Sequence, residues 1–323
     1  MSKINPMSSP NVSIEDPDSI GAIINRPLLD SRLKYSGMTE IIFIVGPTAV
    51  GKTEIALLLA QKLSAEIISC DAMQVYKEIN IASAKPTKKD LAKVPHHCLN
   101  LVSVTESFDA AQFRREAWKA LQNIYQRGKR VVMAGGSGMY VSVLLDGLFE
   151  EPAKDENLRR QLEADIRREG TFVLHQRLKT LDAKAAAKIH ANDARRIIRA
   201  LEVILTTQKP ISKLQQERRG WWGQYTIQIF GLNRPRAELY RRAQERIDQM
   251  FKQGLVQEVK RISKLSLSAT AKAMIGVPEV QGFLRGEYDL ERAKYLMKLH
   301  TRHYIKRQLT WFRRDKRIEW IDA

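Results

Sequence analysis

Residues 41–63 are IIFIVGPTAVGKTEIALLLAQKL, and this stretch decides the fold. Its first five residues are apolar and mostly β-branched, which predicts a buried strand, and residues 54–63 have helical spacing. Between them, residues 46–53 match the phosphate-loop pattern G-x-x-x-x-G-K-[ST] in the strand-to-helix position that the motif requires. The stretch therefore predicts an α/β protein with a P-loop.

The loop is suited to a chain of phosphates. Its glycines let successive backbone N–H groups converge on phosphate oxygens, and the helix that follows adds the positive end of its dipole. Lys52 can neutralise phosphate charge, and the Thr53 hydroxyl can reach Mg²⁺, which we expect as the cofactor. The expected diphosphate site is Gly46, Pro47, Thr48, Ala49, Val50, Gly51, Lys52 and Thr53. Such a loop is also typical of nucleotide-binding and ATP-binding proteins, so the motif alone leaves the ligand open.

Strands and helices alternate through much of the remaining chain. The predicted strands are residues 66–70, 130–134 and 225–232, and the predicted helices are residues 110–127 and 236–263. This alternation predicts a parallel sheet flanked by helices, a P-loop NTPase-like fold. Long polar helices without a convincing strand interrupt it, so we also expect an inserted helical domain.

Composition divides the chain into four segments. Residues 1–37 are rich in proline and small polar residues and have no apolar period, which predicts a disordered extension. The first part of the core is expected at residues 38–151, the helical insertion at 152–209, and the second part of the core at 210–323.

The charge balance favours a polyanionic partner. The chain has 54 Lys and Arg against 36 Asp and Glu, a net charge of +18. Nucleic acid fits better than a membrane, because the apolar stretch 41–50 is too short to cross a bilayer and contains Pro47. Two cysteines are too few for a disulfide scaffold, which favours a reducing, cytoplasmic location. A merely basic surface is the alternative.

Three further features carry possible chemistry. Asp71 ends the second predicted strand, where ligands of open parallel sheets bind, so it could take a proton or hold Mg²⁺; alternatively it caps a helix. The glycine-rich segment 135–140 predicts a close backbone approach to a ligand or a simple tight turn. The adjacent His96 and His97 favour a structural role, because neighbouring residues rarely bind one metal ion.

Two basic clusters lie on predicted helices. The first, within residues 192–203, contains Arg195, Arg196 and Arg199. The second is interleaved with aromatic residues, an arrangement suited to phosphate contact and base stacking, although solvated helix faces are the alternative. Its members are Arg302, Lys306, Arg307, Arg313 and Arg314, among His303, Tyr304, Trp311 and Phe312.

Taken together and in order, these motifs resemble those of the bacterial tRNA dimethylallyltransferases, also called tRNA isopentenyltransferases. The resemblance covers the chain after Met38 and rests on residues 46–53, 71–76, 84–87, 95–97, 135–140, 192–202 and 301–313. It implies transfer of a dimethylallyl group from dimethylallyl diphosphate to N6 of the adenosine immediately 3′ of the anticodon, with release of diphosphate. The implied partners are the tRNA anticodon stem-loop and dimethylallyl diphosphate, with no membrane, and the protein is expected to be a monomer.

The resemblance also implies roles for individual residues. Asp71 would be the catalytic base, with Thr48 and Lys52 acting on the diphosphate, and Lys85 and Arg236 would add phosphate contacts. The implied tRNA contacts are Asp71, Ala72, Met73, Gln74, Ser137, Arg159, Arg195, Arg196, Ile197, Ile198, Arg199, Arg302, Lys306 and Arg307. The sequence departs from the family pattern at residues 277 and 278, where Val and Pro replace an aromatic and a basic residue.

Two other functions remain open on the residues alone. A P-loop kinase of a nucleotide or small metabolite would use the same loop and a nearby acid, but it would consume ATP and has no need of RNA-directed basic helices. A noncatalytic RNA-binding module would have no reason to keep Lys52, Thr53 and Asp71 together.

Overall fold

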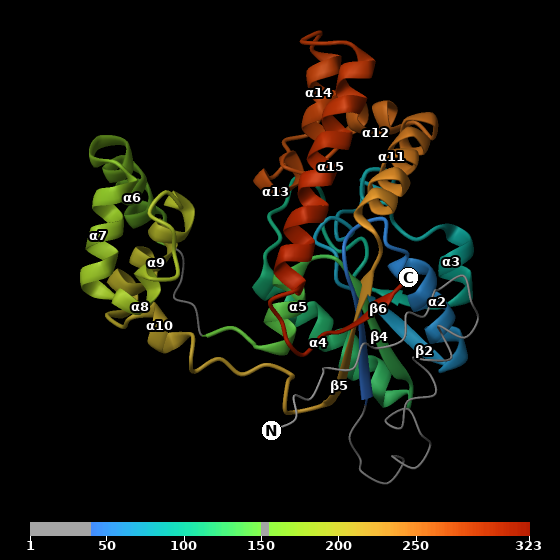
Figure 1. The fold of residues 1–323 in the computed structure, drawn as a ribbon, viewed down its shortest axis with the longest axis horizontal. Coiled ribbons are helices and arrows are strands. Elements are labelled where there is room, and N and C mark those ends of the chain that lie inside the picture. Colours follow the sequence, from blue (N-terminus) through green and yellow to red (C-terminus); the bar gives the residue numbers. More distant parts are fainter. Residues whose placement is uncertain (1–39, 150–154) are drawn as a thin grey trace, which may run out of the picture. The chain divides into compact units, whose positions relative to one another are not determined.

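The computed structural model describes residues 40–149 and 155–323, in two compact units (Figure 1). One unit comprises the described residues up to Ser142 together with Gly223–Ala323, and the other is Val143–Trp222. The second unit contains most of the predicted insertion 152–209 and extends beyond it on both sides. The predicted extension 1–37 lies outside the described residues.

The first unit is built on a six-stranded parallel sheet with strand order β3-β2-β4-β1-β5-β6. β1 lies in the interior, where Ile41 pairs with Val131 of β4 on one side and Ile227 of β5 on the other. Burial on both faces explains why its sequence is continuously apolar. The strands are β1 (Glu40–Val45), β2 (Ala65–Ser69), β3 (His96–His97), β4 (Arg130–Gly135), β5 (Thr226–Asn233) and β6 (Glu319–Asp322). The expected α/β fold is confirmed.

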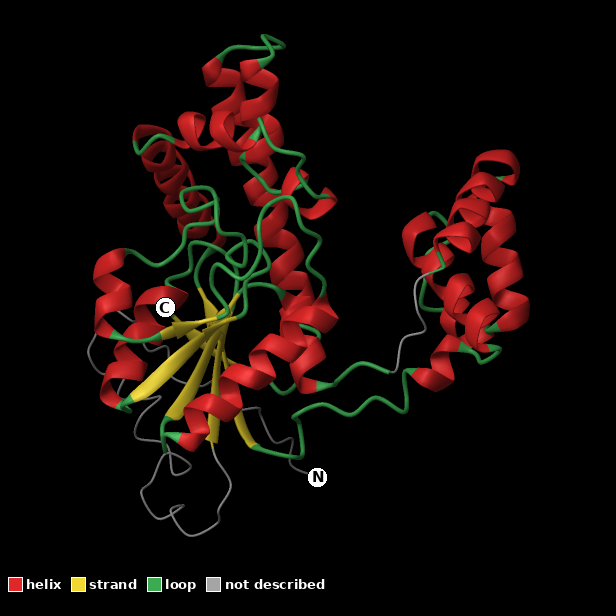
Figure 2. Cartoon of the chain, turned by 180° about the vertical axis from the view of Figure 1, so that it is seen from behind, coloured by secondary structure: helices red, strands yellow, loops and turns green. Residues whose placement is uncertain are grey.

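Helices cover both faces of this sheet (Figure 2). α2 (Lys52–Lys62) packs its apolar residues against Ile42 and Ile44 of β1. α4 (Ala110–Gln126) buries Phe113 and Leu121 on the opposite side. Alternate strand residues point to opposite faces, so each helix meets a different set of strand side chains. The short helices α3 (Lys88–Lys93) and α5 (Gly138–Leu145) complete this part of the chain.

Helices that follow β5 extend beyond the carboxyl end of the sheet (Figure 1). They are α11 (Arg236–Lys252), α12 (Leu255–Ile262), α13 (Ala269–Lys272), α14 (Val277–Leu284) and α15 (Leu290–Phe312). The prediction of one helix over residues 236–263 is wrong. The chain breaks at Gly254, whose φ of 102° lies in the left-handed region that ends a helix, and α12 begins at the next residue.

The second unit is helical, as expected. Its helices are α6 (Glu156–Glu169), α7 (Thr171–Leu181), α8 (Ala183–Ala186), α9 (Ala194–Thr207) and α10 (Ile211–Leu214). They enclose a small core that includes Leu162, Leu178 and Leu201. The buried Asp182 carboxylate accepts the N–H groups of Ala185 and Ser212, at 3.0 and 2.8 Å, and so joins α8 to α10. Among residues 40–149 and 155–323, no helix is long and apolar enough to cross a membrane.

Candidate active site at the phosphate loop

A cavity of about 660 Å³ opens in the first unit beside the P-loop. Its wall comes from the P-loop, the segment after β2, and the helices α11 and α15. The lining includes Thr48, Lys52, Asp71, Arg246, Tyr304 and Gln308. Sequence segments far apart thus bring cations, a carboxylate and backbone donors to the carboxyl end of the parallel sheet, where the sequence predicted the site.

Close backbone packing and hydrogen bonds from two arginines hold the P-loop in its conformation. Gly46 has a φ of 143°, and a Cβ there would come within 2.8 Å of the Leu232 carbonyl oxygen of β5, so a side chain is excluded. Arg242 Nε donates to the Ala49 carbonyl at 3.0 Å, and Arg234 Nε donates to the Val50 carbonyl at 3.1 Å. In a trans peptide the N–H points opposite to the C=O, so these bonds fix the orientation of the next two N–H groups. The loop is therefore preorganised as a cradle for an anion.

Burial in the cavity shifts the pKa values of Lys52 and Asp71 in opposite directions. Burial lowers the pKa of Lys52 to about 7, although the Asp71 charge raises it, and Lys52 Nζ donates to the Pro47 carbonyl at 2.7 Å. Burial raises the pKa of Asp71, against the Met73 N–H that its Oδ1 accepts at 2.9 Å and the charges of Lys52 and Arg246. A carboxylate with a raised pKa is a stronger proton acceptor, and a desolvated lysine gains most when a phosphate arrives.

Arg246 of α11 is a site residue that the sequence reasoning missed. Burial lowers its pKa while Asp71 raises it, and its side chain lines the cavity. Arg236, the predicted phosphate contact at the start of the same helix, is exposed and does not line the cavity. The helix runs away from its first turn, so the cations that reach the cavity lie two and three turns further along. The only available signal was the helical spacing of Arg242 and Arg246.

Lys85, the other predicted phosphate contact, is engaged by groups of its own segment. Its ammonium donates to the Asn100 side chain at 2.6 Å, to the Asn80 side chain at 3.2 Å, and to the Tyr76 carbonyl. Burial lowers its pKa to about 8, against the nearby carboxylates. Lys85 does not line the cavity, whereas its neighbours Ala84 and Pro86 do. These contacts hold the segment after β2 together, and the phosphate contact of Lys85 stays a prediction.

The segment after β2 is fixed by hydrogen bonds to its own side chains. Gln74 Oε1 accepts from Ser69 at 2.8 Å, and Gln74 Nε2 donates to the Ser83 and Ala84 carbonyls at 3.4 and 3.3 Å. The amide of Gln74 is thus engaged within the protein, although the residue also lines the cavity. Ala72 donates its N–H to the Ser137 hydroxyl at 2.9 Å, so the glycine-rich segment touches this one. These bonds place Asp71 and Met73 at the cavity.

On α15 the predicted basic and aromatic residues separate into two groups. Tyr304 and Arg307 line the cavity, with the Arg307 guanidinium 5.7 Å from the Tyr304 ring centroid. Arg302 and Lys306 are exposed. Phe312 is 1% exposed, so its prediction as a stacking residue is wrong: the helical period turns it into the core. Trp311 packs on α5, where a Cβ at Gly138 would lie 2.4 Å from its ring.

In the second unit, some of the predicted tRNA contacts are exposed and others are buried. Arg195 and Arg196 are exposed on α9, and Arg159 of α6 pairs with Glu163 at 3.4 Å. Ile197 and Ile198 are 0% and 7% exposed, which contradicts a side-chain contact with tRNA, because α9 turns them into the helical core. Arg199 Nη1 donates to the buried Glu202 carboxylate at 2.9 Å.

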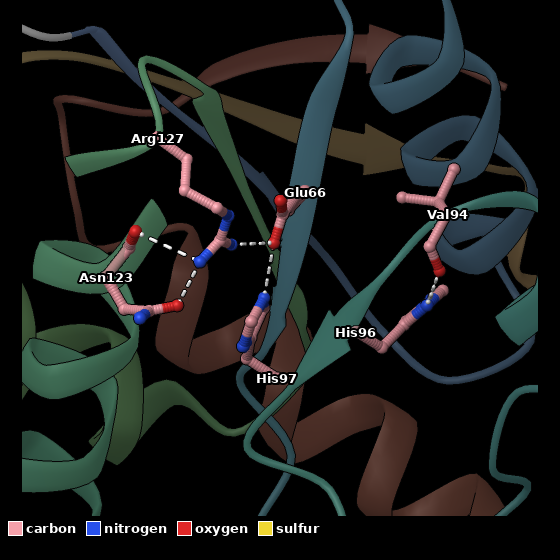
Figure 3. A network of polar contacts seen from close by, with 6 residues as sticks. All are labelled: Glu66, Val94, His96, His97, Asn123 and Arg127. Carbon is pink, nitrogen blue, oxygen red and sulfur yellow. Dashed lines mark hydrogen bonds and ion pairs between the residues drawn. The ribbon is translucent and has the colours of Figure 1, made fainter. Parts of the chain in front are cut away.

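The paired histidines serve the edge of the sheet (Figure 3). His97 Nε2 lies 2.7 Å from the Glu66 carboxylate, which also accepts from Arg127 at 2.6 Å, and Arg127 reaches Asn123 of α4. His96 uses Nδ1 on the Val94 carbonyl at 2.8 Å, and so points away from this network. Their contacts give both residues a structural role, and His96 in addition lines the cavity beside the P-loop.

The described residues of the cavity offer Mg²⁺ only a small set of protein ligands. In the described ranges, no group of three or more His, Cys, Asp or Glu side chains could hold a metal ion. Thr53 and Asp71 nevertheless line the same cavity as the P-loop. Magnesium is commonly held by one or two protein oxygens together with substrate phosphates, so the residues present fit such an ion bound with its diphosphate.

Comparison with known proteins decides the family. A model of the IPP transferase family matches residues 74–315, which is most of the chain. The tRNA dimethylallyltransferase of Geobacter metallireducens is 43% identical over 292 residues, covering 90% of this chain and 94% of the relative. This chain belongs to the tRNA dimethylallyltransferase family. The family's enzyme from Geobacter sulfurreducens is also 43% identical, over 88% of this chain and 92% of the relative.

Solved structures of the tRNA dimethylallyltransferase family agree. The full-length tRNA isopentenylpyrophosphate transferase of Bacillus halodurans has a TM-score of 0.64 at 38% identity, covering 88% of this chain and 89% of that one. A eukaryotic dimethylallyltransferase acting on tRNA has a TM-score of 0.76 at 29% identity, covering 88% of this chain and 74% of that one. The resemblance in the motifs is confirmed.

Proposed function

We propose that this cavity is where the chain transfers a dimethylallyl group from dimethylallyl diphosphate to N6 of the adenosine immediately 3′ of a tRNA anticodon. The observation that carries the proposal is the convergence of Lys52, Arg246 and Asp71 on one cavity beside a preorganised P-loop. Family membership supports this reaction and gives no support to the kinase alternative.

The cationic side of the cavity acts on the leaving group. As the allylic C–O bond breaks, negative charge builds on the departing diphosphate, and fixed N–H donors stabilise it without reorganisation. Lys52 and Arg246 add positive charge in a partly desolvated site, where electrostatic interactions are stronger than in water. A Mg²⁺ ion, held by the Thr53 hydroxyl and the diphosphate, would supply further charge neutralisation.

Asp71 acts on the acceptor. The new bond joins the allylic carbon to N6, and N6 must lose a proton, which passes to the Asp71 carboxylate. Burial raises the pKa of this group, and the backbone N–H groups of Met73 and Gln74 orient the carboxylate that takes the proton. Burial and the Asp71 charge raise the pKa of Tyr304 of α15, so this residue stays protonated at the cavity, where its side chain hydrogen-bonds to Ser137.

The tRNA is proposed to use exposed cations in both units. Arg302 and Lys306 on α15, and Arg195 and Arg196 on α9, are exposed and suited to phosphate contact. Arg307 lies at the cavity, where it could meet the phosphate of an unstacked nucleotide. Gln74, by its contacts, positions the Asp71 segment at the cavity that Gln74 itself lines.

The test of the proposal is Asp71→Asn, assayed with unmodified tRNA and labelled dimethylallyl diphosphate in Mg²⁺ without ATP. We expect label on adenosine N6 with the wild type and turnover lowered at least about 100-fold in the variant, with tRNA affinity within about threefold. Asp248→Asn is the matched control. Asp248 lies on α11, is half-exposed and pairs with Lys298 of α15. Unchanged turnover in Asp71→Asn removes it from catalysis, and label absent from the wild-type product overturns the function.

A further inference from the structure

Gln308 of α15 connects the P-loop to the glycine-rich segment. It is 5% exposed and lines the cavity. Its Oε1 accepts the N–H of Thr48 at 2.9 Å, and its Nε2 donates to the Gly136 carbonyl at 2.9 Å. Both ends of the amide are thus engaged with backbone groups, which fixes which end is oxygen and which is nitrogen.

The space for this amide depends on a glycine. A Cβ on Gly136 would lie 2.3 Å from Gln308 Nε2 and 3.3 Å from the Gly46 carbonyl oxygen. The backbone of residue 136 therefore approaches the P-loop closely, with the glutamine amide beside both. An alanine at this position would displace the amide, because the end of a flexible side chain moves more easily than backbone.

The contact changes what the P-loop offers to a ligand. Within the part of the chain that the structure describes, the N–H groups of residues 49–53 have no hydrogen-bond acceptor, so they are available to phosphate oxygens. The next N–H toward the start of the loop, that of Thr48, already donates to Gln308. A phosphate chain that extended past residues 49–53 would find this donor occupied and would meet the amide oxygen, itself an acceptor.

We propose that Gln308 makes the loop selective for diphosphates by occupying the N–H that a third phosphate would need. The inference rests on the proposed function for the diphosphate site and adds a specificity-determining residue to it. The selectivity follows from an unpaired ligand oxygen: a triphosphate would bring an acceptor against the Gln308 amide oxygen, whereas a diphosphate seated on the N–H groups of residues 49–53 would end before this position.

The experiment compares inorganic diphosphate with inorganic tripolyphosphate by calorimetry at fixed free Mg²⁺, without tRNA. We expect the wild type to bind diphosphate at least about tenfold more tightly, as one charge-assisted hydrogen bond would predict. Gln308→Met, which keeps the volume and frees the Thr48 N–H, should reduce this ratio at least about threefold. Gln253→Met is the control, because Gln253 is exposed at the end of α11 and does not line the cavity, so the ratio should stay unchanged.

Gly136→Ala keeps the test decisive if Gln308→Met does not fold. This variant retains the glutamine but pushes its amide aside, so it should lower the same ratio. A wild type that binds both anions equally, or a ratio within about twofold of the wild type in the folded variants, overturns the proposal. Because the assay uses no tRNA and no transfer, its outcome is independent of whether label reaches adenosine N6.

Discussion

Replacing Glu258 with Gln should loosen the segment after β2 that lines the active site. Glu258 of α12 is 5% exposed, and its carboxylate accepts three consecutive backbone N–H groups. Oε2 lies 2.8 Å from Asn80 N and 2.9 Å from Ile81 N, and Oε1 lies 3.0 Å from Ala82 N. One carboxylate therefore fixes the turn from which Ala82 reaches the cavity.

The magnitude follows from counting these donors. A glutamine keeps one acceptor oxygen, which can serve two of the three N–H groups, and turns its amide nitrogen toward the third. A buried donor without an acceptor costs about 1–3 kcal/mol, and the loss of charge at the two remaining bonds costs about 1 kcal/mol each. We therefore expect the free energy of unfolding to fall by about 3–5 kcal/mol, a large share of the stability of an ordinary domain.

The measurements are urea unfolding and hydrogen exchange of amides 80–82. Exchange at these positions should accelerate before global unfolding, because the carboxylate bonds are their hydrogen bonds. Glu287→Gln is the control, since Glu287 pairs with Arg285 at the surface and its replacement should leave the urea midpoint unchanged. The reasoning is refuted if Glu258→Gln loses less than about 1 kcal/mol and leaves exchange at 80–82 unchanged.

Three further outcomes follow from charge. The pKa of Lys52 is about 7, so Lys52 is mostly neutral at pH 8 and mostly protonated at pH 6 before diphosphate binds. Diphosphate binding should therefore take up about 0.9 proton more in the wild type than in Lys52→Met at pH 8, and about 0.1 proton more at pH 6. Calorimetry in two buffers measures this difference. Burial alone would raise the pKa of Glu66, but hydrogen bonds from Arg127 and His97 outweigh it and hold the pKa below 4.5. The stabilisation is therefore full above that pH and lost as pH falls through the folded-state pKa, so Glu66→Gln should lose stability at pH 7 and converge with the wild type in acid unfolding. Lys306→Ala should reduce the slope of log tRNA affinity against log salt by about one, and an unchanged slope would remove the proposed phosphate contact.

The sequence alone determined the elements and the chemistry that depend on neighbouring residues. The apolar run of β1, the P-loop pattern and the helix after it lie within residues 41–63, and each is set by local periodicity or backbone freedom. Asp71 could be predicted as well, because it directly follows a strand and parallel strands end at the ligand-binding edge.

Tertiary structure decided which charged and polar side chains reach that edge. Lys85 is engaged in its own segment and Ile197 lies in a helical core, whereas Arg246 and Gln308 arrive from helices far along the chain. A basic or amide side chain looks the same in sequence whether it faces a ligand or a backbone carbonyl. The choice depends on desolvation and on hydrogen-bond partners that come together only when distant segments pack.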